Sequence, residues 1–144
     1  MSNLSNNYIA GDWVKGASSI SNINPSNTND VIGEFAQASS AQLEDALNSA
    51  QVAQRHWAAT GLEQRQAVLM KIGEEMMARS AELGELLSRE EGKPVAEGKG
   101  EVYRAGQFFT YYAAEVLRQG GDTADSVRPN IEIDVRREPM GTVA

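Results

Sequence analysis

The chain has 144 residues, 41% hydrophobic and 23% charged, which suffices for one domain with a hydrophobic core. Its formal net charge of -7 argues against nucleic acid or an anionic membrane surface as a partner, because both attract clustered Lys and Arg. The absence of cysteine excludes disulfides, thiolate metal sites and a cysteine nucleophile within these residues. No apolar run is long enough to span a bilayer, and the first residues lack signal-peptide features, so we expect a cytosolic (cytoplasmic) protein.

Short strands are expected near the N-terminus. Residues 8–14 predict two strands around a turn at Gly11-Asp12, because aromatic and β-branched residues flank a turn-forming pair. Residues 20–23 and 31–36 are further strand candidates, and 24–30 is rich in turn residues.

Three helices are predicted next. The first covers about 40–58 after a capping box of Ser39 and Gln42, and the second runs from a box at Thr60 and Glu63 to about Glu91, roughly 40 Å long. The third lies between Pro94 and Gly120. The positions at helical spacing are Leu43, Leu47, Ala50, Gln54 and Trp57, then Val68, Ile72, Met76, Leu83 and Leu87, then Val102, Ala105, Phe109, Tyr112 and Val116.

The second and third helices meet at Gly92-Lys93-Pro94. Gly92 suits the left-handed position past a helix end, and Pro94 can open a new helix, so we predict two antiparallel helices joined at this corner. Gly98, Gly100 and Gly106 follow. Each glycine lowers the stability of a helix by up to about 1 kcal/mol relative to Ala. We therefore predict either a late start of the third helix or a close crossing with a neighbouring helix.

After the third helix, the spacing of the apolar residues changes from every three or four positions to every second position. Residues 122–129 are predicted to form a loop, and Ile131, Ile133 and Val135 alternate with polar residues as in a half-buried strand. Residues 140–144 are apolar and predict the start of another strand. Because the chain would stop as it enters its core, we expect a fragment of something longer.

Candidate chemistry is sparse. His56, the only histidine, lies near a helix end, where a surface role is favoured over catalysis. Glu90-Glu91 is either a general base pair or, the preferred reading, the solvated end of a long helix. Lys93 precedes Pro94 and so is not part of a phosphate loop. The aromatic residues within 108–112 fit core packing or subunit contact better than a ligand box.

Several short motifs occur in a fixed order along the chain, namely Tyr8-Ile9-x-Gly11-x-Trp13, Asn24-Pro25, the helix end from Ala50 to Trp57, Glu91-Gly92-Lys93-Pro94, Gly100-Glu101-Val102 and Glu138-Pro139-x-Gly141. Together they resemble the N-terminal part of one family, the NAD(P)-dependent aldehyde dehydrogenases. Within this family, residues 88–115 look closest to the 2-oxoglutarate semialdehyde (2,5-dioxopentanoate) dehydrogenases.

This resemblance implies an α/β fold, in which residues 1–144 form the helical layer and peripheral strands of a partial cofactor-binding domain, truncated before the parallel sheet. Residues 130–138 would be a strand directed toward an oligomerisation sheet. The implied activity is oxidation of a small aldehyde to a carboxylic acid with NAD or NADP, by a Cys nucleophile, a Glu base and an Asn that stabilises the oxyanion. We expect no catalytic or cofactor-binding residue in this chain, which alone would be inactive, and a homodimer or homotetramer for the parent.

The resemblance also implies a candidate site for a monovalent cation. Its ligands would be main-chain oxygens of Asn22 and Ile23 and the side chain of Glu101, since oxygen ligands suit a hard cation. A corner without a bound ion is the favoured alternative, because many members of the family with an acid at this position are not known to bind one. A different function class also stays open, namely a free-standing acidic helical interaction module that binds a partner helix along the face from Val68 to Leu87.

Overall fold

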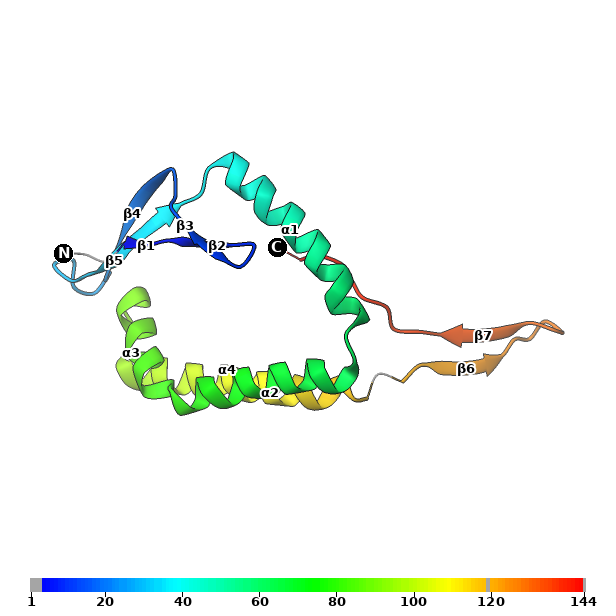
Figure 1. Ribbon diagram of the computed structural model, residues 1–144. Coiled ribbons are helices and arrows are strands. Elements are labelled where there is room, and N and C mark those ends of the chain that lie inside the picture. The colour runs from blue at the N-terminus through cyan, green and yellow to red at the C-terminus, as the bar shows by residue number, and fades with distance from the viewer. Residues whose placement is uncertain (1–3, 119, 144) are drawn as a thin grey trace.

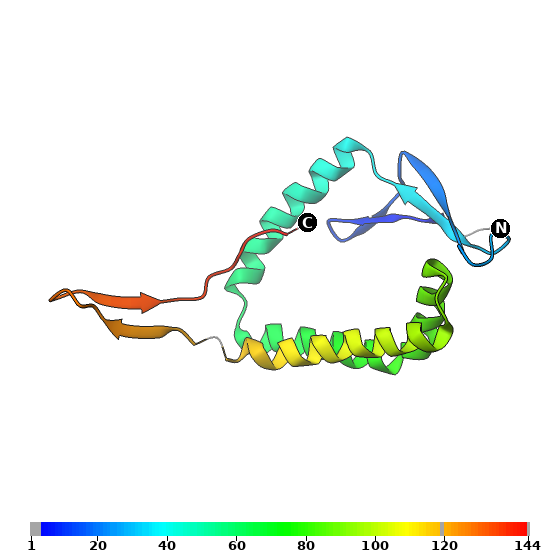
Figure 2. The same ribbon diagram turned by 180° about the vertical axis from the view of Figure 1, so that it is seen from behind.

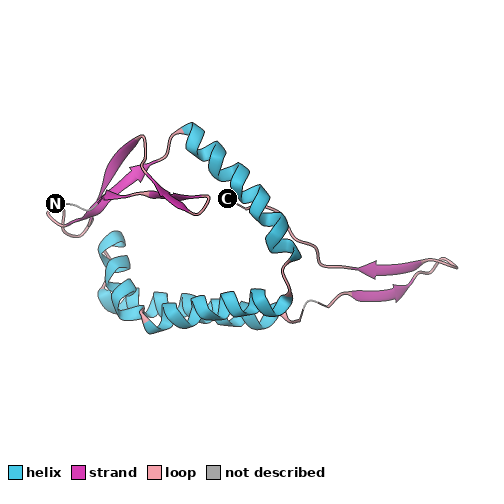
Figure 3. Cartoon of the chain, viewed as in Figure 1, coloured by secondary structure: helices cyan, strands magenta, loops and turns pink. Residues whose placement is uncertain are grey.

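The computed structural model describes residues 4–118 and 120–143. Figure 1 shows an open, ring-like arrangement in which α2 and α4 run side by side, α1 lies across from them, and one two-stranded arm projects outward; Figure 2 shows the same from behind. Figure 3 shows the strands gathered at the two ends of the molecule, with the helices between them. The elements are β1 (Leu4–Ser5), β2 (Asn7–Ile9), β3 (Asp12–Val14), β4 (Ser18–Ile23), β5 (Val31–Gln37), α1 (Ser40–Ala59), α2 (Leu62–Ala78), α3 (Ser80–Glu91), α4 (Val95–Val116), β6 (Asp122–Asp125) and β7 (Glu132–Val135).

The strands near the N-terminus form two small sheets. One has the order β1-β5-β4, with β1 parallel and β4 antiparallel to β5, and the other is the β2–β3 hairpin. The hairpin turn consists of Ala10 and Gly11, whose φ angles are 54° and 97°. The turn therefore lies one residue before the predicted turn at Gly11-Asp12. Two consecutive residues with positive φ suit a two-residue hairpin turn, because they match the twist of the flanking strands. The sequence did not predict β1.

The capping box before α1 is confirmed. Gln42 N donates to Ser39 Oγ at 3.2 Å, and Ser39 N donates to Gln42 Oε1 at 3.0 Å. The second predicted capping box, at Thr60 and Glu63, is wrong. The residue before α2 is Gly61, which makes no side-chain cap, and Thr60 Oγ1 instead donates to the His56 carbonyl at 2.9 Å, so it closes α1 rather than opening α2.

The predicted long second helix is wrong in one respect, because it is divided at Arg79 into α2 and α3. Arg79 has φ -97° and ψ 13°, outside helical geometry, and its N–H still bonds to the Glu75 carbonyl. Its guanidinium pairs with Glu82 at 2.8 Å on the next helix. No Gly or Pro lies at the break, so periodicity alone could not locate it. The chain therefore has four described helices rather than three.

Glycines bring α4 close to both preceding helices, as predicted. A Cβ on Gly73 would lie 2.7 Å from the Gly106 carbonyl oxygen, and Gly84 packs on the backbone at Gly98. Since later residues of α4 meet earlier residues of α2, the helices are antiparallel, which confirms the helical hairpin. Gly100 has open space around it and takes no part in the crossing.

The hydrophobic core is small. The buried apolar residues are Val102, Ala113 and Val116, and no large side chain is fully buried among the described residues. Tyr112, predicted to face the core, is 58% exposed. The neighbouring Ala113 is buried instead, and its small side chain suits the close helix crossing. Val68 is 41% exposed, so the predicted apolar stripe of α2 is not the surface that meets α4.

The arm of the molecule is a hairpin of β6 and β7. Residues 122–125 were predicted as a loop but form β6, which pairs antiparallel with β7. The predicted β7 strand is confirmed, and Ile133 is 46% exposed, but the arm projects from the body (Figure 1), so this strand does not pack on the hydrophobic core. Residues 140–143 form no strand, and Ala144 lies outside the described residues. None of the described helices combines the length and apolarity that crossing a membrane requires.

Candidate functional site

The corner between α3 and α4 is fastened to the turn between β4 and β5. Gly92, with φ 77°, closes α3 in the predicted left-handed conformation, and Pro94 precedes α4. Ser26 Oγ donates to the Gly92 carbonyl at 2.7 Å. Two motifs distant in sequence, Asn24-Pro25 and residues 91–94, therefore meet in space.

A charged pair strengthens this attachment. The Arg89 guanidinium donates twice to the Asp30 carboxylate, at 2.6 and 2.9 Å. The bond from Arg89, with a second from Asn24, lowers the pKa of Asp30 to about 2. Bidentate pairing fixes orientation as well as charge, so this pair orients the end of α3 toward the residue that precedes β5. Nothing in the sequence pattern predicted this pair, because its members are 59 positions apart.

The first two predicted cation ligands lie beside this corner. Asn22 and Ile23 end β4 at a bulge, where the pairing register with β5 shifts. The Asn22 side chain donates to Glu90 Oε1 at 2.8 Å, which brings β4 to the end of α3. Glu90 therefore acts as an acceptor in a structural contact.

Glu101, the third predicted ligand, is paired with Lys93. The Lys93 ammonium bonds to Glu101 and lies 2.5 Å from Glu91 Oε2, and these two carboxylates raise its pKa, Glu101 most. In this arrangement the residues do not fit a bound cation unless Lys93 turns away, since the ammonium neutralises Glu101. Among residues 4–118 and 120–143 no group of three or more His, Cys, Asp or Glu is placed to hold a metal ion.

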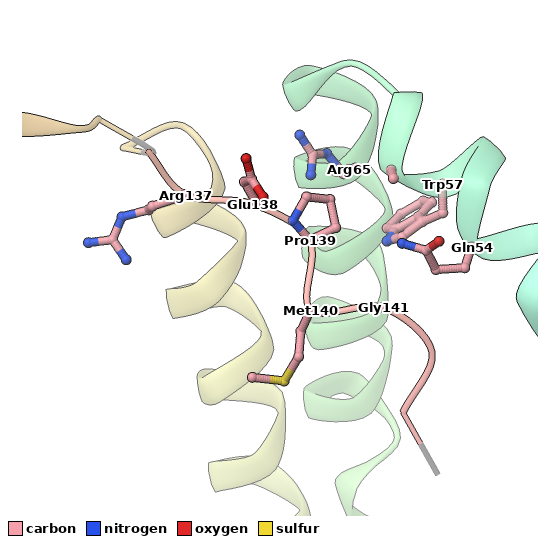
Figure 4. A pocket seen from close by; sticks show the side chains of 9 residues that line it. Gln54, Trp57, Arg65, Arg137, Glu138, Pro139, Met140 and Gly141 are labelled. Carbon is pink, nitrogen blue, oxygen red and sulfur yellow. The ribbon is translucent and has the colours of Figure 1, made fainter. Parts of the chain in front are cut away.

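A hollow of about 390 Å³ lies where the ends of α1 and α2 meet the segment 137–141. Figure 4 shows Pro139 beside the Trp57 ring, while Arg137 points away from the other side chains. Arg65, on the first turn of α2, lines the hollow. Its Nε is buried and has no hydrogen-bond partner among the described residues. The motif Glu138-Pro139-x-Gly141 thus lies against the helix end containing Trp57.

A second hollow, of about 720 Å³, separates the β2–β3 hairpin from α1. Its walls are mostly apolar, and His56 is at its edge. Ser49 also lines this hollow, but its hydroxyl donates to the Ala46 carbonyl at 2.9 Å, and no carboxylate is among the lining residues. The described residues therefore place no base and orienting carboxylate around His56. The lining residues are Tyr8, Ile9, Ala10, Gly11, Ala46, Ser49, Ala50, Val52, Ala53 and His56.

The aromatic residues of α4 mostly face outward. Phe108, Tyr111 and Tyr112 are 55%, 60% and 58% exposed, and only Phe109 is partly covered. Arg104 lies over the Phe108 ring at 5.6 Å, and the two tyrosines make an edge-to-face pair. Packing within this chain therefore does not account for most of the group, and subunit contact stays a prediction.

The comparisons with known proteins agree on one family. The sequence pattern of the Aldehyde dehydrogenase family matches residues 13–144. The chain is 31% identical to the alpha-ketoglutarate semialdehyde dehydrogenase of Haloferax volcanii, across 100% of the chain and 30% of the relative. It is 33% identical to the glutarate-semialdehyde dehydrogenase of Pseudomonas putida, across 95% of the chain and 29% of the relative.

The fold agrees as well. The structure of a betaine aldehyde dehydrogenase from Staphylococcus aureus in complex with NAD+ matches with a TM-score of 0.85 at 26% identity, over 94% of this chain and 28% of that one. The chain thus spans about three tenths of the length of the relatives that it matches. On the strength of the matching motifs and fold, this chain belongs to the aldehyde dehydrogenase family.

Proposed function

We propose that the chain is the N-terminal portion of an NAD(P)+-dependent aldehyde dehydrogenase that oxidises a semialdehyde, such as 2-oxoglutarate semialdehyde, to the acid. The observation that carries the proposal is the match over nearly the whole chain to semialdehyde dehydrogenases, in sequence and in fold. The names of the two curated relatives support the substrate class. We also keep the cytosol as the expected location.

In this proposal the chain supplies scaffold rather than chemistry. It contains no cysteine, so a thiolate nucleophile must come from outside these residues. The corner at Gly92 and its attachment through Asp30 and Arg89 hold the helices at a fixed angle to the β4–β5 sheet. Residues 1–144 would form part of the cofactor-binding domain, whose nicotinamide cofactor accepts the hydride.

The projecting arm supports a role in assembly. Residues 130–138 include β7, and Ile131, Ile133 and Val135 are about half exposed there, which is typical of an apolar surface awaiting a partner. We infer that the arm joins a sheet shared between subunits of a homodimer or homotetramer. A monovalent cation held by Asn22, Ile23 and Glu101 remains a separate proposal that requires Lys93 to release Glu101.

A graft tests the proposed function. The region of the Pseudomonas putida relative that matches this chain would be replaced by residues 1–144, and NAD(P)H formation measured with glutarate semialdehyde, the substrate that the name of the relative gives. A parallel graft from the Acinetobacter baylyi succinate semialdehyde dehydrogenase, 32% identical to this chain, shows whether the acceptor tolerates a foreign N-terminal part. Activity of both grafts supports the proposal. An active control beside a folded but inactive graft of this chain contradicts it, and would favour the interaction module.

A further inference from the structure

The C-terminal end of α3 gathers negative charge. Glu90 and Glu91 lie in the last turn of this helix, where the free backbone carbonyls already carry partial negative charge. Arg89, the basic residue of that turn, is engaged by Asp30 through two hydrogen bonds. The side chain that donates to Glu90 is the uncharged amide of Asn22. Neither contact supplies a positive charge to Glu91, so this helix end needs a further cation.

Lys93 supplies that cation. Its ammonium bonds to Glu101, near the start of α4, and lies 2.5 Å from Glu91 Oε2. The Lys93 side chain is only 19% exposed, whereas lysine is mostly exposed in folded proteins. Holding a lysine in one conformation costs more side-chain entropy than holding most residues, so its two carboxylate contacts have to offset that loss. One ammonium thus joins the end of α3 to the beginning of α4.

The backbone on both sides of Lys93 is held in place. Gly92 ends α3 in the left-handed conformation, and its carbonyl accepts a hydrogen bond from Ser26 Oγ at 2.7 Å. Pro94 follows Lys93, and its ring fixes φ, which is -58° here. The corner therefore presents the ammonium to Glu101 without the loss of translational freedom that a free ion incurs on binding.

We propose that Lys93 is the resident cation of this corner, so that the candidate ion site at Asn22, Ile23 and Glu101 is latent and takes up a monovalent ion only when the ammonium is removed. An ammonium group and a potassium ion carry the same charge, and both are attracted by oxygen atoms. Two such charges beside one carboxylate repel each other, so the ammonium and the ion exclude each other at Glu101. This inference goes beyond the proposed function and depends on neither the substrate nor the activity.

Thermal unfolding of the graft of residues 1–144 tests the proposal. The midpoint is measured in mixtures of potassium chloride and tetramethylammonium chloride at a constant total concentration, so that charge screening stays the same. Lys93→Met removes the ammonium and keeps an unbranched side chain. Lys99→Met is the matched control, because it removes the same charge from an exposed position early in α4.

The unsubstituted graft is expected to unfold at the same temperature in every mixture, and so is the Lys99→Met graft. Lys93→Met should lower the midpoint by about 1–2 °C in the absence of potassium. This loss should be recovered in proportion to the logarithm of the potassium concentration, as the binding of a ligand to the folded state requires. Adding Glu101→Gln to Lys93→Met should abolish the recovery, because it removes the carboxylate that the ion would share.

Two results would overturn the proposal. One is a potassium-dependent rise of the midpoint in the unsubstituted graft that Glu101→Gln removes, because an ion would then bind at Glu101 while Lys93 is present. The other is a Lys93→Met graft whose midpoint is the same in all mixtures. If Lys93→Met does not fold, the first comparison still decides, since it needs only the unsubstituted and Glu101→Gln grafts. The activity of the graft bears instead on the proposed function, so the two failures are distinguishable.

Discussion

Substitution of two glycines in α4 by alanine should have opposite effects on stability. Gly106 lies at the crossing with α2, where an added Cβ would be 2.6 Å from Met77 Cγ and 2.8 Å from the Gly73 carbonyl oxygen. The Gly73 backbone cannot rotate away, so one helix must shift. Gly100 lies on the same helix with nothing within 4 Å of its would-be Cβ.

The magnitudes follow from two competing effects. Alanine gains up to about 1 kcal/mol over glycine in a helix interior, and overpacking costs about 1–3 kcal/mol. Because one of the close neighbours of Gly106 is a backbone atom, the cost there should be near the upper end. Gly106→Ala should then lower the free energy of unfolding by about 2 kcal/mol, while Gly100→Ala raises it by up to about 1 kcal/mol.

Urea unfolding of the graft of residues 1–144, followed by far-UV circular dichroism, measures both variants against the unsubstituted graft, because a midpoint requires a cooperative transition. The difference between the two variants should be about 2–3 kcal/mol and should appear in the midpoint rather than in the slope. A Gly106→Ala chain as stable as the Gly100→Ala chain would refute the close crossing of α2 and α4.

Three further predictions concern charge and cooperativity. The pairing with Arg89 lowers the pKa of Asp30 to about 2. The contribution of this pair to the stability of the fold should therefore be complete above the ordinary carboxyl range and be lost as the pH falls through about 2. Arg89→Met should weaken this loss of stability in acid, which a series of thermal unfolding curves at different pH values measures. Lys93→Met removes the ammonium that pairs with Glu101. If the cation site exists, potassium chloride should raise the thermal stability of this variant more than tetramethylammonium chloride does. An identical response to both salts would count against the cation proposal. The isolated chain should melt without a sharp near-UV transition, since the few buried apolar residues leave little of the usual 5–15 kcal/mol; a sharp transition in a monomeric sample would contradict this.

Local signals in the sequence predicted the parts of the fold that local chemistry decides. The box at Ser39 and Gln42 forms because both partners lie within one helical turn. Gly92 ends α3 because its left-handed conformation suits glycine. The crowding at Gly98 and Gly106 was also predictable, because glycine inside a helix usually reflects a close neighbour.

Features decided by distant contacts were not predictable. The break at Arg79 has no helix-breaking residue, and the pair of Asp30 and Arg89 joins segments that no periodic pattern connects. The alternation at Ile133 was read correctly as a strand, but its burial depends on a partner that the chain does not provide. The candidate cation ligands Asn22, Ile23 and Glu101 were named together from the resemblance, whereas the pairing of Glu101 with Lys93 was not predicted.

We propose that residues 1–144 are the scaffold of an aldehyde dehydrogenase without its chemistry. Aldehyde-dependent NAD(P)H formation, measured side by side for the pure 144-residue chain and for the graft, tests it most directly. We expect no turnover by the chain alone, which has no cysteine, and turnover by the graft. Turnover by the chain alone, or a folded graft that is inactive while the control graft works, would contradict it.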